Sequence, residues 1–315
     1  MDIDSIEWRV LPILSHANFN RGIKKIKSVV MQDTSLTGFV GFNVEKLNRL
    51  NINNNRFLER IESTVKEVDG ELVIAANSKG LKVILSDLEY AEKVVIKDAD
   101  EVDIGNLENV KQNAEFINNK FTQLDVPHLK EVGASLSISK NANLERADFS
   151  SLTDVGGGLI VIDNMELNKI DCFPSLKTIG GAIEFRGDIE ESSMQQLRLV
   201  KGSAIVKSSS SSFDCKNWIE NQVSDVVRGG KIECGSGNSK TTEVFLVDDN
   251  GDITKGAAGV NEMKDQGKES GPEEIETKTS ESSGHKLLSR FSTKGTYGIV
   301  IPSFAWGFIT CLSFW

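Results

Sequence analysis

The sequence contains little proline, few aromatic side chains and less positive than negative charge. Five prolines and 7% aromatic residues in a chain of 315 residues fit a repetitive β structure. The 36 lysines and arginines are outnumbered by 46 acids, which gives a net charge of −10. This balance argues against nucleic acid as a partner, because binding to phosphate backbones requires a basic surface.

Metal-ligating residues are also scarce, and the few present are badly spaced for a site. The cysteines contain no Cys-x-x-Cys pair, and the histidines contain no pair at the i, i+4 spacing of a helical metal site. The three histidines are His16, His128 and His285, and the four cysteines are Cys172, Cys215, Cys234 and Cys311. The sequence therefore predicts no metal, no cofactor and no catalytic residue. It also lacks any Asn-any-Ser/Thr sequon, so it offers no acceptor for N-linked glycans.

The dominant positive feature is a repeat in residues 129–185, which contain one pattern two and a half times. Its equivalent apolar positions are Val132, Val155 and Ile179, then Leu136, Leu159 and Ile183, then Ile138, Val161 and Phe185. Leucines that close successive copies are 19, 22, 23 and 24 residues apart; they are Leu88, Leu107, Leu129, Leu152 and Leu176. This spacing is close to that of leucine-rich repeats and predicts a stacked-repeat fold. In weaker copies upstream, the position of Val132 is taken by Val110, Tyr90, Val68 and Lys46.

One copy of the repeat predicts a short strand with one apolar face. Leu136 and Ile138 alternate with serines, and a single strand of this kind cannot bury its apolar side alone. Stacked copies pair their strands in parallel and bury the apolar residues in continuous columns, which predicts a parallel β-solenoid over residues 26–207. Glycines at 156–158 and 180–181 are expected to permit a tight turn before the strand.

An asparagine recurs nine residues after the first apolar position of most copies. These residues are Asn55, Asn77, Asn119, Asn141 and Asn164; Ala99 and Asp188 occupy the same position in two other copies. A side-chain amide can bond to the backbone or to its equivalent in the next copy, so the pattern predicts a structural asparagine ladder. Local turn formation by each asparagine is the alternative interpretation.

The segment after the repeats has the features of a cap. Five serines at 208–212 cannot contribute to a core and predict a loop, with O-glycosylation as one use. Residues 218–227 predict a short amphipathic helix, which Gly229 and Gly230 end. Cys215 and Cys234 bracket this unit, and we interpret them as a disulfide that closes the end of the solenoid. Two reduced thiols in a cytosolic protein are the alternative.

The composition changes again after the cap. Residues 243–281 hold eleven acids and four lysines, which predicts a disordered acidic stalk over residues 237–284. Residues 285–315 consist of a polar spacer and an uncharged tail of twenty residues, and three small residues, Ser282 to Gly284, precede them. This order predicts a GPI-attachment signal with the anchor at Ser282. A retained tail that anchors the chain in a membrane is the alternative.

The repeats LKEVGASLSI and LKTIGGAIEF, the cysteine-bracketed cap and the tail resemble the fungal GPI-anchored cell-wall family with receptor L-domain-like repeats, which includes the yeast sporulation-specific proteins. The resemblance covers residues 40–236 and the tail signal. It implies a mainly β solenoid held at the plasma membrane outer leaflet or in the cell or spore wall. No secretory signal is found in residues 1–25, so we expect the chain to begin inside the family's first domain.

Four functions follow from these patterns. The first is a non-enzymatic, GPI-anchored surface protein that organises the fungal cell wall or spore wall, with wall glucan or wall proteins as partners. The second is a ligand- or glycan-binding module, for which Phe116, Phe149 and Phe185 are the aromatic candidates, although the repeat register assigns Phe116 and Phe185 to the core. The third is a polysaccharide-active enzyme, which would need clustered acids such as Asp100, Glu101 and Asp103 in one cleft. The fourth is a tail-anchored intracellular relict of the family.

The sequence thus predicts five segments. They are a degenerate N-terminal segment (1–25), the repeat solenoid (26–207), the C-terminal cap (208–236), the acidic stalk (237–284) and the anchor signal (285–315).

Overall fold

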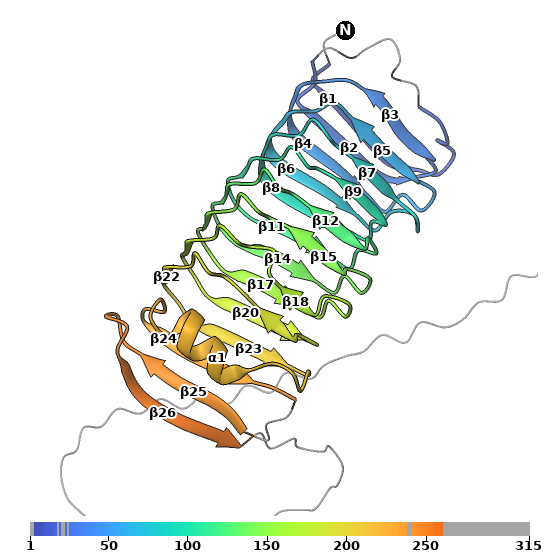
Figure 1. The fold of residues 1–315 in the computed structure, drawn as a ribbon. Helices are drawn as coiled ribbons and strands as arrows, with labels where there is room; N and C mark the ends of the chain where they lie inside the picture. The colour runs from blue at the N-terminus through green and yellow to red at the C-terminus, as the bar shows by residue number, and fades with distance from the viewer. Residues whose placement is uncertain (1–2, 18, 20–22, 24, 238–240, 261–315) are drawn as a thin grey trace, which may run out of the picture. The chain divides into compact units, whose positions relative to one another are not determined.

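The repeats fold as a β-solenoid with two walls. The computed structural model describes residues 3–17, 19, 23, 25–237 and 241–260. In these residues the chain winds through stacked turns, and each turn adds strands to a long wall and to an opposite, shorter wall (Figure 1). The predicted fold class, a mainly β parallel solenoid with a disulfide-closed C-terminal cap, is confirmed.

The long wall is one sheet that extends from the first turn to the last. Its strands are β1 (Ser5–Leu11), β2 (Ser28–Thr34), β4 (Lys46–Asn53), β6 (Glu67–Ala75), β8 (Tyr90–Lys97), β10 (Asn109–Val110), β11 (Ala114–Ile117), β13 (Glu131–Val132), β14 (Leu136–Ser139), β16 (Asp154–Val155), β17 (Leu159–Ile162), β19 (Thr178–Ile179), β20 (Ile183–Gly187), β22 (Leu199–Val200), β23 (Ala204–Ser208), β24 (Gly230–Gly235), β25 (Thr241–Val247) and β26 (Ile253–Val260). Pairing is parallel up to β24, whereas β25 and β26 add an antiparallel hairpin.

The opposite wall consists of shorter parallel strands. They are β3 (Gly38–Phe42), β5 (Arg60–Ser63), β7 (Lys82–Ile84) and β9 (Glu101–Asp103) in one sheet, β12 (Gln123–Asp125) with β15 (Arg146–Asp148), and β18 (Lys169–Ile170) with β21 (Glu191–Ser192). Two helical turns, α1 (Cys215–Trp218) and the π-helical η1 (Ile219–Val223), follow the last full turn of the solenoid.

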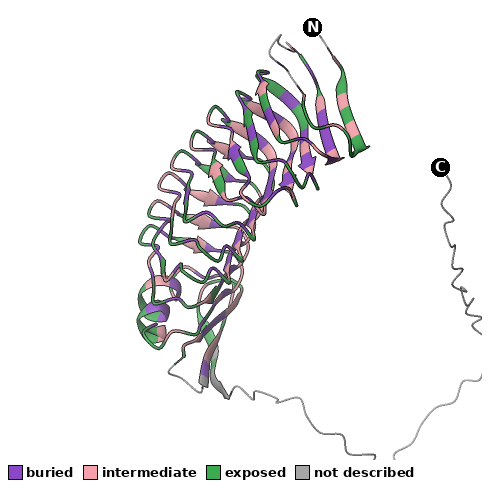
Figure 2. Ribbon diagram, turned by 90° about the vertical axis from the view of Figure 1, so that its right-hand side faces the viewer, coloured by how far each residue is buried: buried purple, intermediate pink, exposed green. Residues whose placement is uncertain are grey.

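The core lies between the two walls and is built from columns of apolar side chains (Figure 2). Leu136 pairs with Leu159, and Leu159 pairs with Ile183, so the register predicted from the repeat is confirmed. The closing leucines, from Leu88 to Leu176, are fully buried in the same core. Each turn therefore buries the apolar face of its neighbours, as a stacked repeat requires.

Two of the weaker copies depart from the predicted alignment. The residue paired with Val68 is Leu47 on one side and Ala91 on the other, not Lys46 and Tyr90. The register shifts after Leu47 and after Val68, which is the effect of a β-bulge: one extra residue on one strand displaces the pairing. The bulges keep the apolar Leu47 and Ala91 in the core and leave the Lys46 side chain exposed.

The glycines that precede the strands serve close stacking and not a special turn. None of the glycines at 156–158 and 180–181 has a left-handed backbone. A Cβ built on Gly156 would lie 2.1 Å from the carbonyl oxygen of Gly133, and one on Gly180 would lie 2.1 Å from that of Gly156. The prediction that a side chain would obstruct this segment is therefore confirmed, and the obstruction comes from the backbone of the neighbouring turn, which approaches Gly156 and Gly180 too closely for a side chain.

Two predicted segment boundaries are also wrong. The segment 1–25 contains β1, which pairs in parallel with β2 and is a strand of the long wall. Part of the stalk predicted from residue 237 is ordered, because β25 and β26 extend the sheet through residue 260. Ser282, the remainder of the stalk and the tail lie outside the described residues. Within the described part of the chain, no helix has the length and hydropathy needed to span a bilayer.

Candidate functional site

The predicted asparagines line one corner of the solenoid, just after the strands of the long wall. Asn55, Asn119, Asn141 and Asn164 are buried, and Asn77 is half-buried. Each carboxamide oxygen accepts the backbone N–H of the residue at the same place in the preceding turn. The donor–acceptor pairs are Thr34–Asn55 (3.0 Å), Asn55–Asn77 (3.1 Å), Ala99–Asn119 (2.9 Å), Asn119–Asn141 (2.9 Å) and Asn141–Asn164 (3.0 Å).

The carboxamide nitrogens complete the ladder. Each Nδ2 donates to a carbonyl oxygen of the preceding strand, at Met31, Ile52, Ile96, Phe116 and Ile138 respectively. The side chains also bond to one another where two asparagines are consecutive, as Asn141 does to Asn164 at 3.0 Å. Ala99 takes the place of an asparagine and divides the ladder into two runs. Asp188, at the equivalent position of a later turn, is exposed and accepts a hydrogen bond from the Ser209 hydroxyl. These contacts satisfy buried backbone groups, which is a structural role.

The ladder adjoins a column of left-handed residues that the sequence reasoning missed. The residue before each ladder position has a positive φ, between 52° and 63°; these residues are Asp33, Asn54, Ala76, Asp98, Asn118, Lys140 and Asp163. Five of the seven are aspartate or asparagine, the side chains that tolerate this conformation best after glycine. That bias was the signal in the sequence. The left-handed residues turn the chain so that the next side chain points inward.

A groove follows this corner on the outside of the solenoid. Its volume is about 740 Å³, and its lining includes Asn118, Lys140, Asp163 and the exposed Met165. Met165 is 70% exposed, which is unusual for a methionine in this otherwise well-buried repeat. We call this hollow the corner groove; it combines the apolar Met165 with charged groups of both signs.

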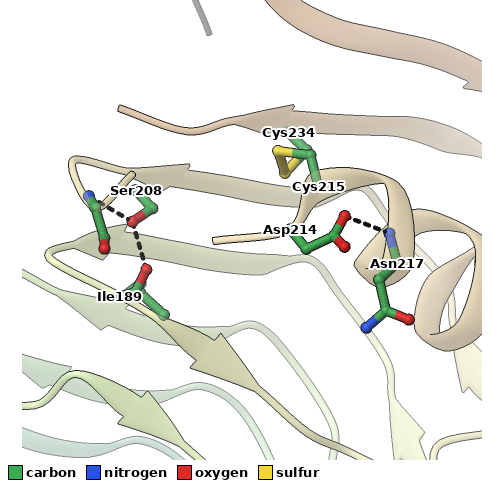
Figure 3. Close-up of a disulfide and its surroundings, with 7 residues drawn as sticks. Ile189, Ser208, Asp214, Cys215, Asn217 and Cys234 are labelled. Atoms are coloured by element: carbon green, nitrogen blue, oxygen red, sulfur yellow. Dashed lines mark hydrogen bonds between the residues drawn. A yellow bond between two sulfur atoms is a disulfide. The ribbon is translucent and has the colours of Figure 1, made fainter. Parts of the chain in front are cut away.

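The C-terminal cap is fastened by the predicted disulfide. Cys215, at the start of α1, bonds to Cys234 on β24 with a Cα–Cα distance of 5.7 Å, so the prediction is confirmed (Figure 3). Asp214 caps α1 by accepting the backbone N–H of Asn217 at 2.9 Å. The helical turns bury Trp218 and Val223 against the end of the core. The disulfide therefore joins the element that covers the core to the sheet itself.

Removal of this disulfide is expected to loosen the cap. The Cys215→Ala/Cys234→Ala variant should lose about 3 kcal/mol of unfolding free energy, because the closed loop spans 19 residues. Urea unfolding followed by circular dichroism measures the loss. Cys172→Ala is the control for cysteine replacement, because the Cys172 thiol forms no disulfide. Burial raises the pKa of this thiol, so Cys172 should stay unreactive towards alkylating reagents in the native protein. Equal stability of the double variant and the wild type would contradict the expectation.

One ionised group on the sheet behind the cap has a shifted pKa. Glu233 is 8% exposed and lies between Lys207, at 2.7 Å, and Lys231, at 2.5 Å. Burial alone would raise the pKa of this carboxyl, but the hydrogen bonds and positive charges of the two lysines outweigh burial and hold it below its usual value. Because the folded-state pKa is lowered, this stabilisation is present at neutral pH and is lost as the pH falls through the folded-state pKa.

Glu233→Gln is expected to lower the unfolding free energy at pH 7 by about 1 kcal/mol and to leave stability less dependent on pH in the acid range. Thermal melts of both proteins at a series of pH values between neutral and acid measure this difference. Glu166→Gln is a suitable control because Glu166 is exposed. If the two variants lose the same stability at every pH, the ion pairs of Glu233 do not act as described.

The outer face of the long wall is a regular surface built from the outward residues of its paired strands. One outward column passes through Val73, Val95, Glu115, Ser137 and Ile160, which pair in sequence along the sheet. A second column contains Ile117 and Ile162 between charged and small residues. The face thus mixes β-branched apolar side chains with charges, and its acids and bases form ion pairs such as Arg49–Glu71 at 2.9 Å.

The acids considered for catalysis do lie together, but two of them, Glu101 and Asp103, are engaged in structural contacts. Asp100, Glu101 and Asp103 line a hollow of about 450 Å³. Glu101 pairs with Lys82 at 2.6 Å, and Asp103 accepts the hydroxyl of Ser86 at 2.5 Å. Among the described residues, no group of three or more acidic, histidine or cysteine side chains is placed to hold a metal ion.

The aromatic candidates for ligand stacking are all inside the core. Phe116, Phe149 and Phe185 have no exposed surface, and Phe149 stacks on Phe173 with ring centroids 5.4 Å apart. The assignment of Phe116 and Phe185 to the core is confirmed, and Phe149 joins them. None of the three is available to a sugar ring.

Comparison with known proteins identifies relatives but no template. The chain is 39% identical to sporulation-specific protein 2 of Saccharomyces cerevisiae, over 91% of this chain and 58% of the relative. It is 32% identical to the cell wall mannoprotein PST1 of the same yeast (76% of this chain, 54% of the relative), and 29% identical to a cell surface GPI-anchored protein of Arthroderma benhamiae (69% and 55%). No family model and no solved structure matches the chain.

The similarity covers the solenoid itself, since an alignment of 291 residues must include most of the described turns. The chain spans a little over half the length of these curated relatives. The solenoid and the disulfide-closed cap occur in the order expected from the resemblance. The chain belongs to the family of fungal sporulation-specific and cell-wall proteins that these relatives represent.

Proposed function

We propose that the chain is a non-enzymatic, GPI-anchored protein of the fungal cell surface that contributes to the organisation of the cell wall or spore wall. The similarity to sporulation-specific protein 2 over 91% of the chain carries this proposal. Three features support it. The solenoid offers long, regular outer faces. Two of the three acids considered for catalysis, Glu101 and Asp103, form structural contacts, and the disulfide suits an oxidising, extracellular environment.

The partners proposed for this surface are wall glucan or other wall proteins, and the membrane through the lipid anchor. Ser282 is the proposed attachment residue. The proposal includes a stalk between the described sheet and Ser282 that holds the solenoid away from the membrane.

Release from intact cells tests the anchor and the location together. An epitope inserted between Gln266 and Gly267, beyond β26, marks the protein at its own locus without interrupting a described strand. Release by a phosphatidylinositol-specific phospholipase or by glucanase is expected. Retention in an internal membrane that only detergent extracts, with Cys215 reduced, would refute the proposal.

A variant in the anchor signal sharpens this test. Replacement of Ser282, Ser283 and Gly284 by tryptophan is expected to abolish enzymatic release, because the attachment machinery requires small residues at this site. The matched control carries three tryptophans at Glu273, Glu274 and Ile275, upstream of the small residues, and should still be released.

Glycan binding is the second candidate function, and the corner groove is the observation that favours it. The groove offers hydrogen-bonding groups at Asn118, Lys140 and Asp163 beside the apolar Met165. Co-sedimentation with insoluble wall glucan is the test. Met165→Asp should reduce the bound fraction, whereas Phe57→Asp, at another exposed apolar residue of the solenoid, should not. Equal binding by both variants would remove the groove from consideration.

A further inference from the structure

A polar hollow lies at the seam between the last turns of the solenoid and the helical cap. Its volume is about 520 Å³. This is within the range of about 300–1,000 Å³ that is usual for small-molecule sites. One side of the hollow comes from residues between 191 and 197, which include β21 and the turn after it, and the other side comes from cap residues between 217 and 226. We call it the seam hollow.

Both sides of the seam hollow are held in place. Across the seam, Gln222 Nε2 donates a hydrogen bond to the backbone carbonyl of Ser192 at 2.5 Å. On the cap side, the Cys215–Cys234 disulfide joins α1, which carries the lining residue Asn217, to the long wall (Figure 3). The hollow is therefore formed by fastened elements, and a site that is already formed costs less free energy to occupy.

Two buried polar atoms of the residues that line the seam hollow have no hydrogen-bond partner in the described part of the chain. They are Ser192 Oγ and Gln222 Oε1. The whole Ser192 residue is only 5% exposed. Buried polar atoms are nearly always paired, so two open ones beside a hollow point to a partner from outside the chain. A hydroxyl group suits both atoms, because it can accept a hydrogen bond from Ser192 or donate one to Gln222 Oε1.

The lining of the seam hollow favours a neutral, polar ligand. Ten of its thirteen residues are polar, and none of the thirteen is a lysine or arginine that could balance an anion. Its acids are Glu191, Glu220 and Asp225, but Lys169 and Lys216 lie 3.6 and 3.9 Å from the first two and offset their charge. Among the described residues, these acids form no group placed to hold a metal ion.

We propose that the seam hollow is a binding site for a neutral sugar unit of a glycan. The ligand hydroxyls bond to Ser192 and Gln222, directly or through a bridging water, and to amides of the lining such as Asn221. A neutral sugar offers many hydroxyls and no charge, which is the complement of this lining. The site is separate from the corner groove and goes beyond the proposed function, since it concerns the described solenoid and cap and not the anchor.

Isothermal titration calorimetry of the full chain with uncharged probes tests the proposal. The probes are the trisaccharides of glucose, mannose and N-acetylglucosamine, and at least one is expected to bind. Ser192→Ala should weaken that binding about tenfold, the effect of losing one hydrogen bond to a ligand. The same variant should not lower Tm, because the Ser192 hydroxyl has no hydrogen-bond partner in the described part of the folded chain. Lost affinity with unchanged stability is the result that a purely structural role would not give.

Ser63→Ala is the matched control. Ser63 is also 5% exposed, but its Oγ donates to the carbonyl of Phe42 at 2.7 Å, so this variant should lose stability and keep the wild-type affinity. Met165→Asp, in the corner groove, should also keep it.

Three results would overturn the proposal. They are failure of all three probes to bind, wild-type affinity in Ser192→Ala, and tighter binding of the glucosamine trisaccharide in mildly acid buffer, where its amines are protonated and would mark a site for cations. None of these results changes the expected enzymatic release of the anchored protein, so failure of the sugar site and failure of the proposed function are distinguishable.

Discussion

Replacement of Asn141 by alanine is expected to destabilise the solenoid by about 4 kcal/mol, the largest effect we predict for a single side chain. Asn141 has no exposed surface. Its Oδ1 accepts the backbone N–H of Asn119 at 2.9 Å, and its Nδ2 donates to the carbonyl of Phe116 at 3.0 Å and to Asn164 at 3.0 Å. Alanine leaves these buried groups without partners, and each such group costs about 1–3 kcal/mol.

Urea unfolding of the Asn141→Ala variant, followed by circular dichroism, measures this loss. Asn143→Ala is a matched control two residues further along the same turn. The Asn143 side chain is exposed and makes one hydrogen bond, at 3.2 Å to the carbonyl of Lys120, so its loss should cost less than about 1 kcal/mol. Similar losses of unfolding free energy in the two variants would show that the buried ladder stabilises the protein no more than a hydrogen bond on the surface does.

The second large effect is expected from Gly156→Ala. The added Cβ would lie 2.1 Å from the carbonyl oxygen and 2.8 Å from the carbonyl carbon of Gly133 in the neighbouring turn. Both are backbone atoms directly after β13, and the backbone N–H of Gly156 bonds to the carbonyl of Val132 there, so relief requires the two turns to separate. A destabilisation of about 3 kcal/mol is expected, in the range of overpacked cores.

Thermal and urea unfolding of Gly156→Ala measure the effect. Gly105→Ala is the control for the glycine-to-alanine change, because a Cβ there meets only the side chain of Asp103 at 3.8 Å, an ordinary contact. It should be neutral or slightly stabilising, since alanine restricts the unfolded chain. If Gly156→Ala were as stable as Gly105→Ala, the close approach between turns would not constrain this column.

Much of the fold could be predicted because the repeat carries two independent signals, its period and its alternation of apolar and polar residues. The period sets the turn length, and the alternation of Leu136 and Ile138 with serines selects the strand and its inner face. The pairing of Leu136 with Leu159 then follows, since any other register would expose an apolar column. The disulfide was also predictable, because Cys215 and Cys234 bracket the short helical segment that was expected to cap the solenoid.

The hairpin β25–β26 could have been recognised but was not. Asn250–Gly251 is a hairpin turn signal, and TTEVFLV before it is rich in β-formers. The acidic composition of residues 243–281 concealed this signal, because an isolated polar hairpin is not stable in water. The edge of β24 stabilises it, and that edge exists only after the solenoid has formed.

By itself, the sequence determined the repeat length, the inward columns, the asparagine positions and the identity of the capping cysteines. Only the tertiary structure decided which residues the bulges place in the core, as with Leu47, and why Gly156 cannot carry a side chain. It also decided that the edge of β24 orders the β25–β26 hairpin. The physical reason is common to all three. Periodicity is a property of one turn, whereas register, spacing and edges are properties of two neighbouring turns and depend on how closely their backbones approach.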